Sequence, residues 1–507
     1  MLFQSYIFIL LFFPLCLLGF WGLKRQKLLQ LWLIAFSLWF YGAASPYYLL
    51  LLLGSIAWNY AFFRAIERGI GRVTERVSGS AMERAEYGME RDSSRKRLLL
   101  GIGIAGNLAL LCFFKYFNAI SAGWSQMKGL EDPILQLALP LGISFFTFQQ
   151  IGFLADAYKG EVGACSLREY VLFVSFFPYV SSGPIVNAQE MLPQYRQIGR
   201  QRLDWAKFSG GLYLFALGLS KKVLLADTFG KAVDAGYGNV AGLSGTDAWL
   251  VMLFYTLQLY FDFSGYCDMA VGLGKMIGLE VAENFDAPFH SASVKEFWRR
   301  WHMTLGRFFT RYVYIPLGGN RRGKMRTLCN VMIVMLLSGL WHGAAWTFVL
   351  WGFLHGVGMI WDNLEHPHLP KKWMRQAATF AYVCMTFVFF RAESIEQGVD
   401  VLKSIVSLKW NGFVFQMASA LDLTEFYMIT KALSMKLPGL LSWFWLGIFV
   451  VLIAICFRVL SGEKVSGVVA LQRQKGYGRL YPVLLAVLFT WSMISMTGVS
   501  EYLYFSF

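Results

Sequence analysis

Many apolar runs in this sequence approach the length of a membrane-crossing helix, and this feature constrains the fold more than any other. A helix needs about 20 apolar residues to cross the hydrocarbon core of a bilayer. The chain is 56% hydrophobic and 15% charged, whereas soluble domains are about 25% charged. We therefore predict an all-α polytopic membrane protein, one membrane domain over residues 1–507 with roughly a dozen embedded helices, at 5–23, 29–43, 46–63, 98–118, 135–156, 170–186, 209–225, 247–272, 328–345, 346–362, 376–390, 440–460 and 481–498.

The positive charge of the chain fits a membrane protein better than a nucleic-acid-binding protein. The net charge is +15, and basic residues gather between the apolar runs. Such clusters follow the positive-inside rule and contact acidic lipid headgroups, so we predict membrane lipids and no nucleic acid among the partners. The seven cysteines are scattered without CxxC or other metal-ligand spacing, which predicts packing roles and no metal site.

The basic loops also predict an orientation. The loop at 24–27 follows the first apolar run, and the stretch 64–97 carries nine basic and six acidic residues, as expected of a charged cytoplasmic loop or helix. Lys221–Lys222 and the segment 458–479 are also interpreted as cytoplasmic. The last span then delivers the aromatic tail, 499–507, to the outside, so both termini are predicted to be extracytoplasmic.

Residues 285–326 form an unusually basic segment between apolar runs. Nine Lys or Arg residues face two acids, Asp286 and Glu296. Aromatic residues alternate with arginines from Ser293 to Tyr314, which predicts one amphipathic helix over that range. The helix is interpreted either as an interfacial element touching headgroups or as a cytoplasmic rim that attracts a polyanion such as the phosphates of coenzyme A. The two interpretations are compatible.

Two histidines lie in strongly apolar surroundings, in Trp301-His302 and in Trp341-His342. A histidine exchanges a proton near neutral pH, and ionisable groups at membrane depth usually serve a function. Taken alone, however, the Trp-His-Gly sequence is more typical of a structural histidine bonded to a carbonyl. His355 is interpreted as a packing residue, and the pair at 366–368 as solvated loop histidines rather than metal ligands.

Asp262 and Asp268 are acids within an apolar run, Tyr260-Phe261-Asp262-Phe263-Ser264-Gly265-Tyr266-Cys267-Asp268. One interpretation is a buried network that holds helices together. The other is that they orient a histidine or line a polar path. Periodicity favours neither.

A set of short motifs, taken in order along the chain, resembles the membrane-bound O-acyltransferase family, and within it the alginate O-acetylation branch. Any one motif is weak, but the ordered set is highly specific and covers most of 135–395, the predicted family core. The motifs are Pro140–Phe148, Gly183–Ile185, Tyr260–Asp268, Glu296–His302, Tyr314–Asn320, Gly339–Gly343 and Phe389–Ala392.

The resemblance implies a fold and a site. The fold is a ring of tilted helices around a thin centre with a buried catalytic tunnel, in the bacterial cytoplasmic (inner) membrane. His342 corresponds to the family's catalytic histidine and His302 to its second conserved polar position. The implied acyl donor is a cytoplasmic coenzyme A thioester, acetyl-CoA, with no bound cofactor. To the two histidines we add the candidate supporting residues Asp262, Asp268, Trp341, Arg299 and Arg300.

The implied reaction is O-acetylation of an extracytoplasmic polysaccharide of the cell envelope. His342 would act as general base on a hydroxyl, and His302 would polarise the thioester carbonyl, stabilise the oxyanion or orient the acceptor. The C-terminal tail is interpreted as an aromatic anchor at the outer interface. It also resembles the aromatic C-terminus of the small membrane peptide of teichoic-acid D-alanylation, which implies that Tyr504 carries the acyl group to a secreted or membrane-anchored SGNH-type transferase.

Other functions remain open at this point. Within the same family, D-alanyl transfer to teichoic acid and O-acetylation of peptidoglycan share these motifs. A polysaccharide or lipid transporter would be a different class, and it predicts inverted repeats and paired broken helices, which the sequence does not display. A non-enzymatic scaffold for a synthase complex would tolerate loss of His342.

Overall fold

The computed structural model describes residues 1–23, 25–77, 82–129, 137–199, 203–364, 370–407, 480–498, 500 and 502–503, with isolated positions between 431 and 451. Within these residues every regular element is a helix, and together with the apolar spans this confirms the all-α polytopic membrane class. The chain forms two compact units, one of Met1–Gly211 with Leu273–Ala282 and the other of Leu212–Gly272 with Glu283–Phe507.

Helices long and apolar enough to cross a bilayer account for part of the predicted spans. In the described residues there are four of them, and three further apolar helices are shorter: the long ones are Pro46–Arg68, Ser94–Met127, Trp205–Gly238 and Lys324–His342, and the short ones are Phe8–Gly22, Trp346–Trp361 and Leu485–Ile494. The predicted span 170–186 is wrong, because its helix ends at Ser175 and a turn rich in Pro and Gly follows. The predicted span 440–460 lies outside the described residues apart from isolated positions.

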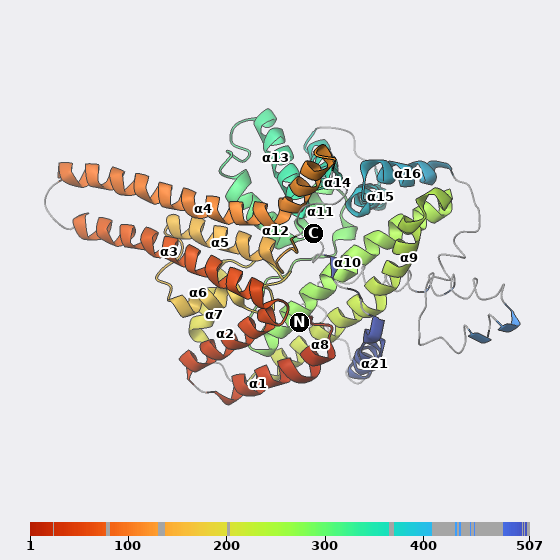
Figure 1. Cartoon of the computed structure of the whole chain (residues 1–507), viewed down its shortest axis with the longest axis horizontal. Helices are drawn as coiled ribbons and strands as arrows, with labels where there is room; N and C mark the ends of the chain where they lie inside the picture. The colour runs from red at the N-terminus through yellow and green to blue at the C-terminus, as the bar shows by residue number, and fades with distance from the viewer. Residues whose placement is uncertain are drawn as a thin grey trace. The chain divides into compact units, whose positions relative to one another are not determined.

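Unit 1 is built around a long helical hairpin. Figure 1 shows α3 and α4 running side by side, with α5 along α4. Asn59 on α3 and Asn107 on α4 exchange two side-chain hydrogen bonds, of 3.1 and 2.6 Å, which fix the register of the hairpin. The described residues of the charged stretch 64–97 form the end of α3 and the start of α4. The helices are η1 (Phe8–Phe12), α1 (Phe13–Gly22), α2 (Gln26–Gly42), α3 (Pro46–Val77), α4 (Met82–Met127), α5 (Ile143–Tyr158), α6 (Leu167–Ser175) and α7 (Ala188–Gln197).

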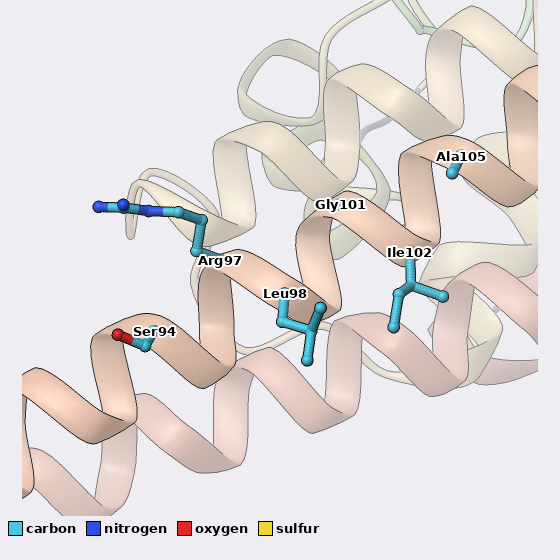
Figure 2. A pocket seen from close by; sticks show the side chains of 6 residues that line it. All are labelled: Ser94, Arg97, Leu98, Gly101, Ile102 and Ala105. Carbon is cyan, nitrogen blue, oxygen red and sulfur yellow. The ribbon is translucent and has the colours of Figure 1, made fainter.

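A surface groove runs along α4 in this unit. Figure 2 shows its lining, with Leu98 and Ile102 on one side of the helix and Arg97 extending away from them. Gly101 and Ala105 leave space because they have little or no side chain, and the groove has a volume of about 540 Å³. None of the candidate site residues lines it.

Unit 2 contains both candidate catalytic histidines. Its elements, two of which (α8 and α10) continue into unit 1, are α8 (Trp205–Ser220), η2 (Lys221–Ala226), α9 (Asp227–Gly238), η3 (Val240–Gly242), α10 (Gly245–Met276), η4 (Pro288–His290), α11 (Val294–Arg300), α12 (Met303–Phe309), η5 (Thr310–Tyr314), α13 (Lys324–His342), α14 (Trp346–Trp361), α15 (Lys372–Arg391), α16 (Ile395–Ser407), α21 (Leu480–Ile494) and η7 (Ser495–Gly498). Figure 1 shows α9 and α10 lying side by side, and α13 close to α14.

Glycines let α13 and α14 touch backbone to backbone. A Cβ on Gly339 would lie 2.3 Å from the carbonyl oxygen of Phe348, and one on Gly352 would lie 2.5 Å from that of Met335. Any larger residue would push the two helices apart, because these neighbours are backbone atoms that cannot rotate away. This tight hairpin holds the last turn of α13, where His342 lies, against the first turns of α14.

The predicted single helix from Ser293 to Tyr314 is wrong, because the chain breaks at the first candidate histidine. Helix α11 ends at Arg300, Trp301 is extended with φ −104° and ψ 130°, and α12 begins at Met303. Between them His302 adopts the left-handed conformation, with φ 43°. Outside glycine this conformation is uncommon and costs energy, so periodicity alone could not reveal the break.

Candidate active site

His302 lies in the turn between α11 and α12, where one asparagine organises the backbone around it. The backbone oxygen of Asn284 accepts the N–H of Met303 at 3.0 Å. Its side-chain oxygen accepts the N–H of Thr304 at 3.1 Å and the hydroxyl of Thr304 at 2.7 Å. Its amide nitrogen donates to the sulfur of Cys267 at 3.3 Å. Asn284 thereby holds the left-handed turn in place.

The same asparagine indicates which ring nitrogen of His302 carries the proton. Nδ1 of His302 lies 3.4 Å from Oδ1 of Asn284. That oxygen is identified by the backbone N–H of Thr304, which can only donate to it. An amide oxygen only accepts hydrogen bonds, so Nδ1 must be the protonated nitrogen. In the neutral ring Nε2 then carries the lone pair.

His342 is the last residue of α13 and lies among aromatic rings. Its ring centroid is 4.9 Å from Phe390, 5.1 Å from Trp351 and 4.8 Å from Trp341, each in an edge-on arrangement. The side chain is buried, with 3% of its surface exposed. A substrate can therefore reach this imidazole only along a channel or after the aromatic walls have moved.

Trp341 connects the two histidines. Its ring contacts His342 on one side and lies 6.1 Å from the ring of His302 on the other. The far side of His302 packs edge-on against Phe263 at 4.7 Å. Two residues separated by forty positions therefore lie in one aromatic site of unit 2, each beside the ring of Trp341.

His355 is a structural histidine, as the sequence predicted. Its Nδ1 accepts the indole N–H of Trp298 at 3.3 Å, and its Nε2 lies 2.9 Å from the hydroxyl of Thr386. That hydroxyl itself donates to the carbonyl of Val383 at 2.8 Å. The three bonds are consistent only with a neutral ring protonated on Nε2, and both nitrogens are occupied in holding α11, α14 and α15 together.

Asp262 and Asp268 each bind a lysine. This agrees with the first of their two interpretations, a buried network that holds helices together. Asp268 contacts Lys221 at 2.6 Å, and Asp262 contacts Lys222 at 2.7 Å. Both lysines are buried, with 4% and 1% exposed, in the middle of the long helix Trp205–Gly238. The structure places both lysines inside unit 2, paired with aspartates, and the side of the membrane on which they lie stays a prediction.

Most cations of the basic rim, residues 285–326, are exposed. The two candidate arginines differ in their contacts, because Arg300 is bound by other residues and Arg299 is exposed. Arg300 is held by Glu296, with a contact of 2.9 Å, and by the backbone oxygen of Asp286 at 3.2 Å. Arg299 is exposed to solvent, as are other basic residues of the segment, namely Lys295, Arg307, Arg321, Arg322, Lys324 and Arg326. Arg300 therefore supports the turn before Trp301, and the exposed cations form a positively charged surface on this segment.

Sequence reasoning missed two residues that shape unit 2. Asn284 lay in a loop motif and gave no sign that it would hold His302. Lys222 was assigned to the aqueous boundary, although the apolar sequence continues after it through Val223-Leu224-Leu225-Ala226. That continuation is the signal that could have placed it inside the protein. Tyr504 and the loop histidines, His366 and His368, lie outside the described residues.

The burial of His302 predicts a pH-dependent stability. Burial lowers the pKa of His302 from 6.5 to about 3, so below pH 6.5 the unfolded chain binds a proton that the folded chain excludes. This histidine should therefore cost the fold about 1.4 kcal/mol for each pH unit between 6.5 and 3, and nothing above that window. His302→Gln does not titrate. Thermal unfolding in detergent should show the wild type losing stability relative to this variant on acidification, and parallel pH profiles would contradict the burial of a neutral imidazole.

Comparison with known proteins gives a family match whose range includes these residues. Residues 95–395 match the membrane-bound O-acyltransferase family, a range that contains both histidines, Trp341 and Asn284. The chain is 36% identical over 444 residues to a peptidoglycan O-acetyltransferase of Helicobacter pylori, covering 80% of each protein. It is 38% identical over 407 residues to a probable alginate O-acetylase of Pseudomonas putida, covering 78% of each.

A weaker likeness extends to a third activity of the same family. A teichoic acid D-alanyltransferase of Streptococcus thermophilus is 32% identical over 253 residues, covering 47% of this chain and 58% of that protein. The family match covers more than half of the chain, and relatives matched over most of their length are named as O-acetyltransferases. This chain therefore belongs to the membrane-bound O-acyltransferase family and is a multi-pass membrane O-acyltransferase.

Proposed function

We propose that this enzyme takes acetyl from acetyl-CoA at the cytoplasmic face and supplies it for O-acetylation of an extracytoplasmic polysaccharide in the bacterial cell envelope. The observation that carries the proposal is the pairing of two buried imidazoles, His302 and His342, through the indole of Trp341. A buried imidazole is suited to taking up a proton without exposing the acyl group to water.

The reaction needs one base and one leaving thiolate. A hydroxyl oxygen attacks the thioester carbonyl, and its proton passes to the imidazole of His342. The new C–O bond forms as the C–S bond breaks, and the thiolate of coenzyme A takes up the proton. Such general base catalysis contributes roughly 10²–10⁴-fold to the rate. The acyl group moves directly from sulfur to oxygen, so no acyl-serine intermediate is required.

The protonation of His302 selects one of its three suggested roles. Its Nδ1 proton is directed at Asn284, so the Nε2 of the neutral ring offers a lone pair and no proton. A lone pair can accept a hydrogen bond from a hydroxyl but cannot donate one to an oxyanion. We therefore assign His302 to orienting the acceptor hydroxyl, rather than to polarising the carbonyl.

The exposed basic rim supports an anionic donor. Arg299 lies on α11, Arg307 lies on α12, and the cations at 321–326 lie just before α13 and in its first turn; all are exposed. Coenzyme A carries several phosphate charges, and clustered cations raise the local concentration of such a ligand. The charged rim and the apolar histidine site thus correspond to the two ends of an acyl-CoA, its phosphates and its acetyl thioester.

The acceptor is proposed to be the chain's own tail. Tyr504 would receive acetyl as a phenyl ester, which is more reactive than a sugar ester and can pass its acyl group onward. A secreted or membrane-anchored SGNH-type transferase would then move the acetyl to the polysaccharide. This arrangement requires the C-terminus to be extracytoplasmic, as we also propose for the N-terminus, with the enzyme in the cytoplasmic (inner) membrane.

Acetyl is favoured over D-alanyl by the extent of the likeness. Relatives named for O-acetylation match about four-fifths of this chain, whereas the D-alanyltransferase match covers 47% of it. Those relatives act on different polymers by name, alginate and peptidoglycan. We therefore propose only that the acceptor polymer is an extracytoplasmic polysaccharide, and peptidoglycan is the alternative acceptor.

Donor identity can be tested with purified enzyme in liposomes. The enzyme is oriented with its cytoplasmic face outward, and acetyl-CoA carrying an isotope label in its acetyl group is added to the outer solution. Mass spectrometry then follows the label on the protein. We expect free coenzyme A to appear together with one labelled acetyl on the C-terminal peptide. A labelled D-alanyl thioester supplied in parallel should give no product; transfer of D-alanyl without transfer of acetyl would overturn the proposed donor.

A further inference from the structure

Unit 2 contains a buried ionic cluster that the proposed reaction does not use, and residues near the C-terminus contact it. The cluster consists of Lys222, Asp227 and Asp262. Lys222 and Asp227 are five residues apart on the same helix, and in a regular α-helix they would point about 140° apart. Here the chain forms a π-helix from Lys221 to Ala226, with the N–H of Asp227 bonded to the oxygen of Lys222. This wider turn places both side chains on one face.

Lys222 is the centre of the cluster. Its ammonium contacts Asp262 at 2.7 Å, Asp227 at 2.9 Å and the hydroxyl of Ser500 at 3.2 Å. An ammonium has three donors, and these three acceptors account for them. The side chain is 1% exposed, and those of Asp262 and Asp227 are 2% and 10% exposed. One cation therefore faces two buried carboxylates, which leaves an excess of negative charge.

Ser500 and Leu503 supply hydrogen-bond donors to these two carboxylates. The hydroxyl of Ser500 donates to Asp227 at 2.6 Å, and the N–H of Leu503 donates to Asp262 at 3.0 Å. The ring of Tyr502 lies 4.9 Å from the ammonium of Lys222 and stacks edge-on against Tyr266 at 5.0 Å. Tyr502 is 1% exposed, so it is held by protein and is not the lipid-facing anchor that the sequence suggested.

We propose that Lys222, Asp227 and Asp262 form a socket for Ser500, Tyr502 and Leu503, and that Lys222 is a positioning residue for the C-terminal tail. The socket fixes the chain at Leu503, the residue directly before Tyr504. Its role in acyl transfer rests on the proposed function, in which Tyr504 accepts acetyl. The retention of the tail by the socket does not depend on it.

A neighbouring ion pair offers a matched control. Lys221 and Asp268 lie on the same two helices and are buried, and Lys221 contacts Asp268 at 2.6 Å. The socket variant is Lys222→Met with Asp227→Asn and Asp262→Asn, and the control variant is Lys221→Met with Asp268→Asn. Neither variant leaves a buried charge without its partner, so neither carries the large penalty of an uncompensated buried ion.

Hydrogen–deuterium exchange of the C-terminal peptide measures whether the socket holds the Leu503 amide. In the wild-type enzyme the Leu503 amide should be protected. In the socket variant its exchange should accelerate about tenfold or more, as expected when charge-assisted hydrogen bonds are lost, and in the control variant it should keep its protection. A tail that exchanges rapidly in the wild type, or equally in both variants, would overturn the socket.

A second variant tests the tail side without disturbing the buried charges. Ser500→Ala combined with Tyr502→Leu leaves all three charged residues in place, so the enzyme should fold even if the socket variant does not. The Leu503 amide should again lose protection in this variant. Full protection would contradict the proposal.

Measuring acetyl transfer to the tail distinguishes failure of the socket proposal from failure of the proposed carrier role of Tyr504. In both tail-releasing variants kcat for labelling of the C-terminal peptide should fall about tenfold or more, while KM for acetyl-CoA stays unchanged. If the tail is released and kcat is unaffected, Lys222 does not position the tail for transfer. If Tyr504→Phe retains polymer acetylation while the exchange results hold, the carrier proposal fails and the socket stands.

Discussion

Replacing His342 with glutamine is expected to lower acetyl transfer by about 10²–10⁴-fold, the range that general base catalysis contributes. Glutamine has a polar side chain of similar length but cannot take up a proton at working pH. The loss should appear in kcat, because His342 acts on the hydroxyl and its aromatic surroundings do not include the basic rim. Initial rates with purified protein and labelled acetyl-CoA measure the effect.

The matched control for this prediction is His355→Gln. His355 is also buried in unit 2, but its two ring nitrogens are occupied by Trp298 and Thr386. Its replacement should lower the melting temperature, because a buried hydrogen bond is broken, and leave the rate per folded molecule near that of the wild type. A His342→Gln enzyme that retains most of its rate would remove the base from the mechanism and favour the scaffold alternative.

Replacing Tyr504 with phenylalanine, or removing residues 504–507, is expected to abolish acetylation of the surface polysaccharide. The substitution removes one phenolic oxygen, which is the atom proposed to accept acetyl. Protein amount and melting temperature should stay unchanged, because Ser500, Tyr502 and Leu503 still fill the socket. Acetyl content of the purified polysaccharide, measured at equal protein level in membranes, gives the result.

Tyr502→Phe is the matched control for the tail, since it removes the same oxygen two residues away and keeps the ring beside Lys222. Polysaccharide acetylation should persist in this variant. If acetylation persists equally in Tyr504→Phe, the tail carries no acyl group, and the acetyl must reach the polymer by another acceptor.

The sequence predicted the helical class well, because apolar length is a local property. It failed where structure depends on contacts distant in the chain. The predicted helix 293–314 has the right periodicity, yet it breaks at His302 because Asn284 holds the left-handed turn. Lys221 and Lys222 resembled a boundary because their partners, two acids on α10, lie 40 and 47 residues away.

The candidate site shows the same division. Composition and motif order singled out His302 and His342, but their spacing along the chain does not place two rings together. Contact arises through Trp341, through the glycine contact between α13 and α14, and through Phe390 on α15. The tautomer of His302, which selects its proposed role, depends on the position of Asn284 and is not encoded in any local pattern.

The most direct test of the central claim is access to position 342 from each side of the membrane. His342→Cys is placed in sealed vesicles of known orientation, treated with a membrane-impermeant thiol reagent from one side at a time, and the modified residue is identified by mass spectrometry. We predict slow modification from both faces, with coenzyme A blocking it from the cytoplasmic face alone. Position 342 remaining unmodified from both faces, while an Arg299→Cys control in the exposed basic rim reacts, would contradict the account.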